Sequence, residues 1–174
     1  MLIQTYQANW PQQFQQIADV LRIALQSHYQ EIEHVGSTAV PGLAAKPIID
    51  IDIVFTTQKD FLNIKDALEQ LGYYHNGDQG IPDRAVFKRV QNSKHPILDQ
   101  IVHHLYACPE DSAELKRHLL FRDYLRVNPE ARAAYEQLKY EIAELANQDR
   151  KQYAQIKERK ARPMIESFLN LAQK

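Results

Sequence analysis

The stretch IEHVGSTAVPGLAAKPIIDIDIVF, residues 32–55, carries the features that decide the fold. Its last eight residues, 48–55, are rich in isoleucine and end in valine and phenylalanine, a composition that favours a β-strand. Alternate residues of a strand point to the same face. Asp50 and Asp52 are therefore predicted to share one face, and the opposite face is predicted to be apolar core, formed by Ile49, Ile51 and Ile53.

Gly36, Ser37 and Thr38 follow a short extended segment and are predicted to open a turn or a short helix. A glycine lets the backbone approach a ligand closely, and the two hydroxyls stand beside free N–H groups. Such a turn suits a triphosphate or another anion. Lys46, just before the predicted strand, is either a further phosphate contact or a solvated loop lysine.

The two carboxylates of Asp50 and Asp52 are like charges, which are unfavourable close together in a partly buried place unless a cation lies between them. Hard oxygen donors of this kind suit Mg²⁺ or Mn²⁺, which retain water and bind substrate phosphates. The alternative is that both aspartates line the solvated face of a half-exposed strand. The Gly-Ser turn fourteen residues before the first aspartate favours the functional interpretation.

The remainder of the chain is predicted to be a mixture of helices and short strands. Apolar residues at helical spacing predict helices at 10–28, 58–71 (ended by Gly72), 110–127, from the Asn128-Pro129 cap onward, and from about 149 with a kink or break at Pro163. Further strands are predicted at 31–35, 84–90 and 98–107, the last two as an antiparallel hairpin, with a turn-rich segment at 73–83.

This pattern predicts one α+β (mixed α/β) domain over residues 1–174, with a sheet-containing core at about 1–108 and a helical part at about 109–174. The formal net charge of −1 gives no global electrostatic reason to bind nucleic acid, so any basic patch would have to be local. The single cysteine excludes an internal disulfide. There is neither a secretory signal nor an apolar stretch of membrane-spanning length, so we expect a cytoplasmic protein that uses no membrane.

The string HVGSTAVPGLAAKPIIDIDI, residues 34–53, resembles the GrpB family, which is placed in the nucleotidyltransferase superfamily with a polymerase-β-like fold. The resemblance continues over nearly the whole chain, through Trp10-Pro11, Gly80-Ile81-Pro82, the FRDYLR string at 121–126, Tyr135 with Leu138-Lys139, and Tyr153 with Lys157. It implies a small mixed sheet flanked by helices. It also implies that Gly36-Ser37 is a phosphate-binding turn and that Asp50 and Asp52 are metal ligands.

Members of the superfamily carry a third acid on a neighbouring strand, and here the expected strand reads LDQIVHHLYAC, residues 98–108. Asp99 is one candidate, and His104 in place of an acid is the other. Alternation along the strand puts the two on opposite faces. Ile101 and Leu105 share the face of Asp99 and mark it as core, which favours His104 as the residue that faces the site. GrpB-like sequences tend to have a second histidine where this chain has Tyr106. Without a third carboxylate, a two-metal mechanism would not be expected.

The resemblance implies a metal-dependent enzyme that transfers a nucleoside monophosphate from a nucleoside triphosphate to an unidentified acceptor. Arg84, at the start of a strand, is a further candidate for phosphate binding, and a merely polar strand face is the alternative. Two other functions stay open: a non-catalytic nucleotide-binding or interaction module, and a metal-dependent phosphohydrolase. The sequence favours no oligomeric state.

Overall fold

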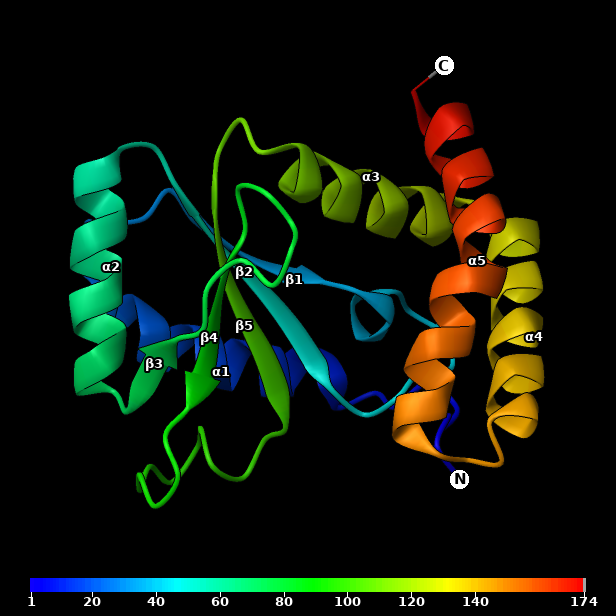
Figure 1. The fold of residues 1–174 in the computed structure, drawn as a ribbon, viewed down its shortest axis with the longest axis horizontal. Helices are drawn as coiled ribbons and strands as arrows, with labels where there is room; N and C mark the ends of the chain where they lie inside the picture. Colours follow the sequence, from blue (N-terminus) through cyan, green and yellow to red (C-terminus); the bar gives the residue numbers. More distant parts are fainter. Residues whose placement is uncertain (174) are drawn as a thin grey trace. The chain divides into compact units, whose positions relative to one another are not determined.

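The computed structural model describes residues 1–173 and contains a five-stranded mixed sheet in the order β1-β2-β5-β4-β3 (Figure 1). The pair β2–β5 is parallel, and the pairs β1–β2, β5–β4 and β4–β3 are antiparallel. The strands are β1 (Glu31–Val35), β2 (Ile49–Phe55), β3 (Tyr73–His75), β4 (Ala85–Arg89) and β5 (His103–Pro109). The sheet and its helices confirm the α+β class.

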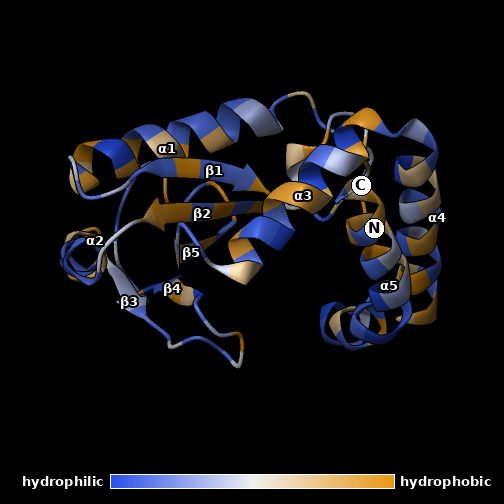
Figure 2. Cartoon of the chain, turned by 90° about the horizontal axis from the view of Figure 1, so that it is seen from above, coloured by the Kyte–Doolittle hydropathy of each residue, from blue (hydrophilic) through white to orange (hydrophobic). Residues whose placement is uncertain are grey.

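β2 is strongly apolar (Figure 2), and its three alternate isoleucines, Ile49, Ile51 and Ile53, are at most 1% exposed. α1 (Trp10–Leu25) packs against this face of the sheet. Its Phe14 stacks on His34, with ring centroids 4.7 Å apart, and His34 is the β1 residue opposite Ile51. The apolar stripe of α1 and the isoleucine face of β2 therefore bury each other.

α2 (Gln58–Gln70) begins at a capping box, in which the Thr57 hydroxyl accepts from the Asp60 amide and the Asp60 carboxylate accepts from the Thr57 amide. The hydrogen bonds from the Thr57 hydroxyl and from the Thr57 amide lower the pKa of Asp60. After the helix the chain turns at Gly72, whose φ of 81° is the left-handed conformation predicted for it.

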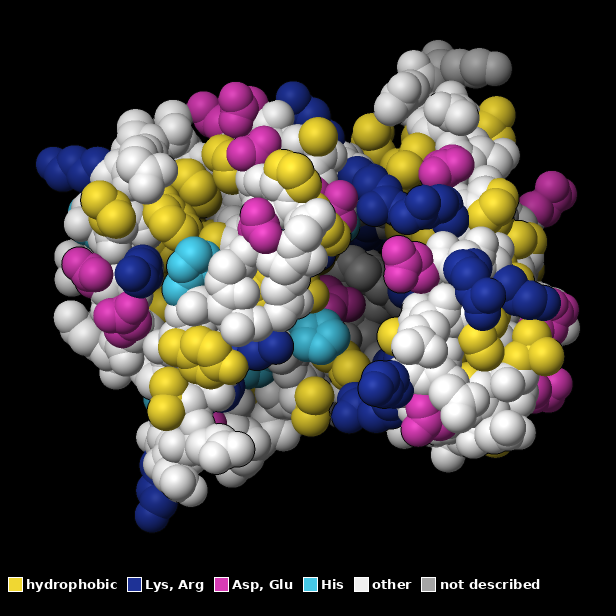
Figure 3. Space-filling model, viewed as in Figure 1, with side chains coloured by type: hydrophobic (Ala, Val, Ile, Leu, Met, Phe, Trp, Pro, Cys, Tyr) yellow, Lys and Arg dark blue, Asp and Glu magenta, His cyan; other side chains and the backbone are white. Residues whose placement is uncertain are grey.

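Three helices form the C-terminal part: α3 (Ala113–Val127), α4 (Pro129–Leu145) and α5 (Arg150–Ala172). α4 and α5 pack together, and Phe121 of α3 meets Tyr135 of α4 edge to face at 5.1 Å. The core of this part also takes in Val40 and Leu43, which lie in the loop between β1 and β2. Figure 3 shows Lys and Arg side chains on the surface over the C-terminal helices.

Contacts group the chain into two compact units. One consists of Met1–Ala8, Gly36–Pro47 and Arg117–Lys174, and the other of Asn9–Val35 and Ile48–Lys116. The loop between β1 and β2 is thus part of the helical unit, although both strands belong to the sheet unit. A single domain stays a prediction. Among the described residues, no helix is long and apolar enough to cross a membrane.

Some predicted boundaries are wrong. β5 begins at His103 and not at 98, because residues 97–101 form a turn closed by hydrogen bonds back to His95 and Ile97. The segment at 73–83 contains a strand, β3, which pairs with β4. α1 ends at Leu25 rather than at 28, and α3 begins at Ala113 rather than at 110. α5 does not break at Pro163, since it runs from Arg150 to Ala172.

Replacing Gly72 by alanine tests the turn after α2. The new Cβ would lie 2.8 Å from Cβ of Ser93, and the alanine would have to keep the backbone φ of 81°. A Cβ on Gly77, whose φ is 69°, would meet nothing within 4 Å. We expect Gly72→Ala to lower the free energy of unfolding by about 2–3 kcal/mol and the control Gly77→Ala by about 1 kcal/mol. Urea unfolding measures both, and equal losses would contradict this account.

Candidate functional site

Asp50 and Asp52 lie on the face of β2 opposite its isoleucines, as the alternation predicts. The Asp50 side chain is 30% exposed, whereas Asp52 is completely buried. Directly paired residues on neighbouring strands share a face. This face therefore also carries the register partners of the two aspartates, which are Val35 and His104 beside Asp50, and Glu33 and Tyr106 beside Asp52.

His104 Nδ1 lies 2.8 Å from Oδ1 of Asp50. An ionised carboxylate can only accept, so Nδ1 is assigned as the donor, and Nε2 is left as the acceptor nitrogen of a neutral ring. The His104 side chain is half-exposed. The sheet thus brings together a carboxylate and an imidazole from adjacent parallel strands, with the second oxygen of Asp50 left for another contact.

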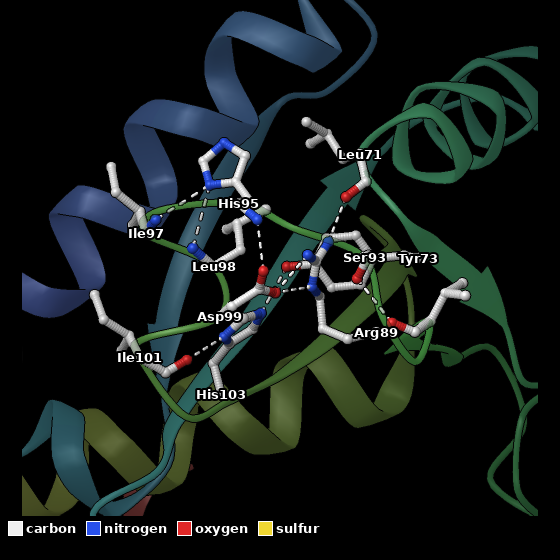
Figure 4. A network of polar contacts seen from close by, with 11 residues as sticks. Leu71, Tyr73, Arg89, Ser93, His95, Ile97, Leu98, Asp99, Ile101 and His103 are labelled. Atoms are coloured by element: carbon white, nitrogen blue, oxygen red, sulfur yellow. Dashed lines mark hydrogen bonds and ion pairs between the residues drawn. The ribbon is translucent and has the colours of Figure 1, made fainter.

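Asp99 lies in the turn before β5 and not on a strand. Its carboxylate accepts from the His95 amide and from the Arg89 guanidinium (Figure 4). These hydrogen bonds, the backbone one first, lower the pKa of Asp99. The same network joins the Tyr73 hydroxyl to His103 Nε2 at 2.6 Å. Since His103 is the register partner of Ile49, the network borders the apolar face of the sheet, opposite to Asp50 and Asp52.

Arg84 precedes β4 and lies close to Tyr106. Its guanidinium carbon is 4.8 Å from the centre of the Tyr106 ring, and Nη1 is 4.0 Å from Oε1 of Glu114. Its Nε is buried and has no hydrogen-bond partner within residues 1–173. Burial, followed by the charge of Asp50, raises the pKa of Tyr106, while the charge of Arg84 opposes this shift. The guanidinium of Arg84 therefore lies on the face of the sheet that carries Asp50 and Asp52.

The surroundings of Cys108 disfavour a reactive thiolate. Burial, followed by the charge of Asp52, raises the pKa of its thiol to about 12. A nucleophilic cysteine needs the opposite shift, because the thiolate is the reactive form.

The Gly36 turn belongs to the helical unit and follows Val35, the register partner of Asp50, directly in the chain. Gly36 has a backbone φ of 71°, a conformation that residues other than glycine rarely adopt. It precedes a one-turn 3-10 helix, Ser37–Ala39. Ser37 is half-buried and Thr38 is 2% exposed. Lys46, at the other end of the loop, places its ammonium 3.9 Å from the centre of the Tyr153 ring.

Two charged or ionisable residues, Glu33 and Lys139, lie at notable positions and are not among the predicted site residues. Glu33 lies opposite Asp52, which only the register of β1 against β2 reveals. Lys139 is 2% exposed, and its Nζ donates to the Ala44 carbonyl. Burial, and then the charge of Lys157, lowers the pKa of Lys139 to about 7. Its place in the apolar stripe of α4, between Tyr135 and Ile142, was a signal in the sequence that could have found it.

The donor chemistry of the acidic face fits a hard divalent cation. Asp50 and Asp52 offer carboxylate oxygens, the ligands that Mg²⁺ and Mn²⁺ prefer, and Mg²⁺ needs only one or two of them when phosphates and waters complete its shell. Within residues 1–173, no group of three or more His, Cys, Asp or Glu side chains is arranged to hold a metal.

The fold resembles that of Cid1, a poly(U) polymerase. The structure of the Cid1 poly(U) polymerase with MgGTP bound matches 82% of this chain and 44% of its own, with a TM-score of 0.56 and 17% sequence identity. The structure of GrpB from Enterococcus faecalis matches 99% of both chains, with a TM-score of 0.80 and 30% identity. A family model described as GrpB protein matches residues 1–167. The chain belongs to the GrpB family.

Relatives in sequence agree with this assignment. A UPF0157 protein of Pseudomonas aeruginosa is 38% identical over 149 residues, which cover 86% of this chain and 60% of the relative. A UPF0157 protein of Bacillus subtilis is 31% identical over 153 residues, which cover 43% of its length. The chain thus spans about half of the length of these two relatives.

The buried amine of Lys139 predicts a pH dependence of stability. Its pKa is about 7 in the folded chain and 10.5 in the unfolded one, so between these values the unfolded state binds more protons and stability rises with pH. We expect the Lys139→Met variant to lose this rise, which is worth about 2–3 kcal/mol between pH 7 and pH 9. Urea unfolding at several pH values measures it. The exposed Lys160→Met is the control, and parallel profiles of Lys139→Met and wild type would contradict the assignment.

Proposed function

We propose that the protein is a metal-dependent nucleotidyltransferase, which transfers a nucleoside monophosphate from a nucleoside triphosphate to an acceptor hydroxyl. The observation that carries the proposal is the pair Asp50 and Asp52 on one face of β2, with Asp50 hydrogen-bonded to His104. The fold that the chain shares with Cid1, a poly(U) polymerase bound to MgGTP in one of its structures, supports it.

In this proposal Asp50 and Asp52 hold Mg²⁺ or Mn²⁺. The cation, when bound, neutralises charge on the α-phosphate and on the departing pyrophosphate. The chain itself contributes binding and orientation, and no covalent nucleophile. Phosphate contacts are assigned to the turn residues Gly36, Ser37 and Thr38, and to Lys46 and Arg84.

His104 has the geometry to accept a proton. Nδ1 donates to Asp50, which orients the ring and leaves Nε2 to take the proton of the acceptor hydroxyl. The acceptor oxygen then forms a bond to the α-phosphorus while the bond from that phosphorus to the bridging oxygen breaks, and pyrophosphate leaves with its electron pair. The second oxygen of Asp50 stays available to the cation.

Two other functions have an observation of their own. The residues of β5 beside the two aspartates are His104 and Tyr106, and neither is a carboxylate, which favours a module that binds nucleotide without turnover. The half-exposed His104 would serve equally to deprotonate water, which favours a phosphohydrolase. Product analysis separates the three: a labelled acceptor, unchanged nucleotide, or free phosphate.

The first test is a thermal-shift panel of ATP, GTP, CTP and UTP, each with Mg²⁺, Mn²⁺ or chelator. A ligand at one hundred times its Kd stabilises the folded state by about 2.7 kcal/mol, which shifts the melting temperature measurably. We expect a shift that needs the metal and that Asp50→Asn and Asp52→Asn abolish. The exposed Asp66→Asn on α2 is the matched control.

Turnover is the second arm of the same experiment. Removing a metal-binding carboxylate is expected to lower kcat by about a hundredfold or more. Full activity in either asparagine variant, or a nucleotide shift indifferent to metal and to both variants, would overturn the assigned role of the two aspartates.

A further inference from the structure

Side chains of α3 and α4 hold the backbone of the loop Gly36–Pro47 at two points. Arg126 Nε donates to the Ala39 carbonyl at 3.1 Å. Glu136 Oε2 accepts from the Ala44 amide at 2.6 Å, and Lys139 Nζ donates to the Ala44 carbonyl. Together Arg126, Glu136 and Lys139 form what we call the loop clamp.

The loop is anchored on both sides of its apolar middle. Val40 and Leu43 are fully buried in the core of the helical unit. Beyond the clamp, Ala45 pairs with Gln4 through two backbone hydrogen bonds of 2.8 and 2.9 Å. A loop with its middle buried and its backbone bonded on both sides has little conformational freedom.

The clamp acts on the turn that the proposed function assigns to phosphate. Ala39 is the last residue of the 3-10 helix that carries Ser37 and Thr38, and its carbonyl is the group that Arg126 binds. The Val40 amide donates to the Ser37 carbonyl at 3.2 Å, which closes the same turn. Any shift of Ala39 therefore moves Ser37.

Glu136 and Lys139 grip one residue from both sides. They lie three positions apart on α4, and they bind the amide and the carbonyl of Ala44 respectively. This fixes the orientation of two successive peptide planes. A buried lysine is an unfavourable way to fill a core, because an apolar side chain of similar length would fill it without desolvating an amine.

We propose that Arg126 and Lys139 are positioning residues, which hold the Gly36–Thr38 turn preorganised for the phosphate groups of the nucleotide. The inference rests on the proposed function and adds to it a control of phosphate affinity by α3 and α4. Preorganisation of this kind raises affinity because the loop loses no further freedom on binding.

The test uses the full chain with the variants Arg126→Met and Lys139→Met, and with the exposed Arg159→Met and Lys160→Met of α5 as matched controls. Hydrogen exchange of the Val40 and Ala44 amides reads the loop without any ligand. We expect exchange to become about tenfold faster in each clamp variant and to stay unchanged in the controls. Arg126→Lys keeps a cationic donor and is expected to restore most of the protection.

Titration with Mg²⁺ and the nucleotide that gives the largest thermal shift reads function. We expect Kd to rise about tenfold in the clamp variants, with kcat at saturation changed less than threefold. A wild-type shift with unchanged exchange and Kd in both folded variants would overturn the clamp alone. Faster exchange in a chain whose wild type binds no nucleotide would overturn the proposed function and the positioning role together, and would leave the clamp a structural feature.

Discussion

The alternation of β2 is the constraint on which the rest of the structure depends. Ile49, Ile51 and Ile53 must lie under α1, and this forces Asp50 and Asp52 onto the other face. A slip of one residue would place both carboxylates against the apolar side of α1 and move three isoleucines to the face that carries Glu33 and His104. The strand therefore has one permitted register, and the same hydrophobic burial that stabilises the sheet unit also places its acidic face.

The neighbours of β2 supply the other residues of the candidate site on that face. β1 and β5 flank it, and their pairing sets Glu33 and Tyr106 on either side of Asp52. β1 runs antiparallel and reaches β2 through the loop Gly36–Pro47, whereas β5 runs parallel and follows a long connection that contains α2, β3 and β4. The side chains beside Asp50 and Asp52 thus come from residues that are far away in the sequence.

The sequence was sufficient for what depends on local pattern and insufficient for what depends on pairing. The periodicity of α1, the left-handed Gly72 and the alternation of β2 are local, and all three are predictable. The start of β5 was misplaced because the Asp99 carboxylate closes a turn with His95, a contact that propensity does not encode. Glu33 is not predictable as a neighbour of Asp52, because only the register of β1 against β2 places the two residues opposite each other. Pro163 is tolerated inside α5, and the helix continues past it.

Asp52 and Lys139 are two ionisable side chains of the described residues that are almost fully buried. Asp52 lies on the acidic face of β2, and Lys139, on α4, contacts the loop that begins at Gly36. Stability alone would favour an apolar side chain at both places, because desolvating a charge is unfavourable and a neutral core is not. At the second of these segments the buried side chain has a visible contact: Lys139 Nζ donates to the Ala44 carbonyl and so orients that peptide.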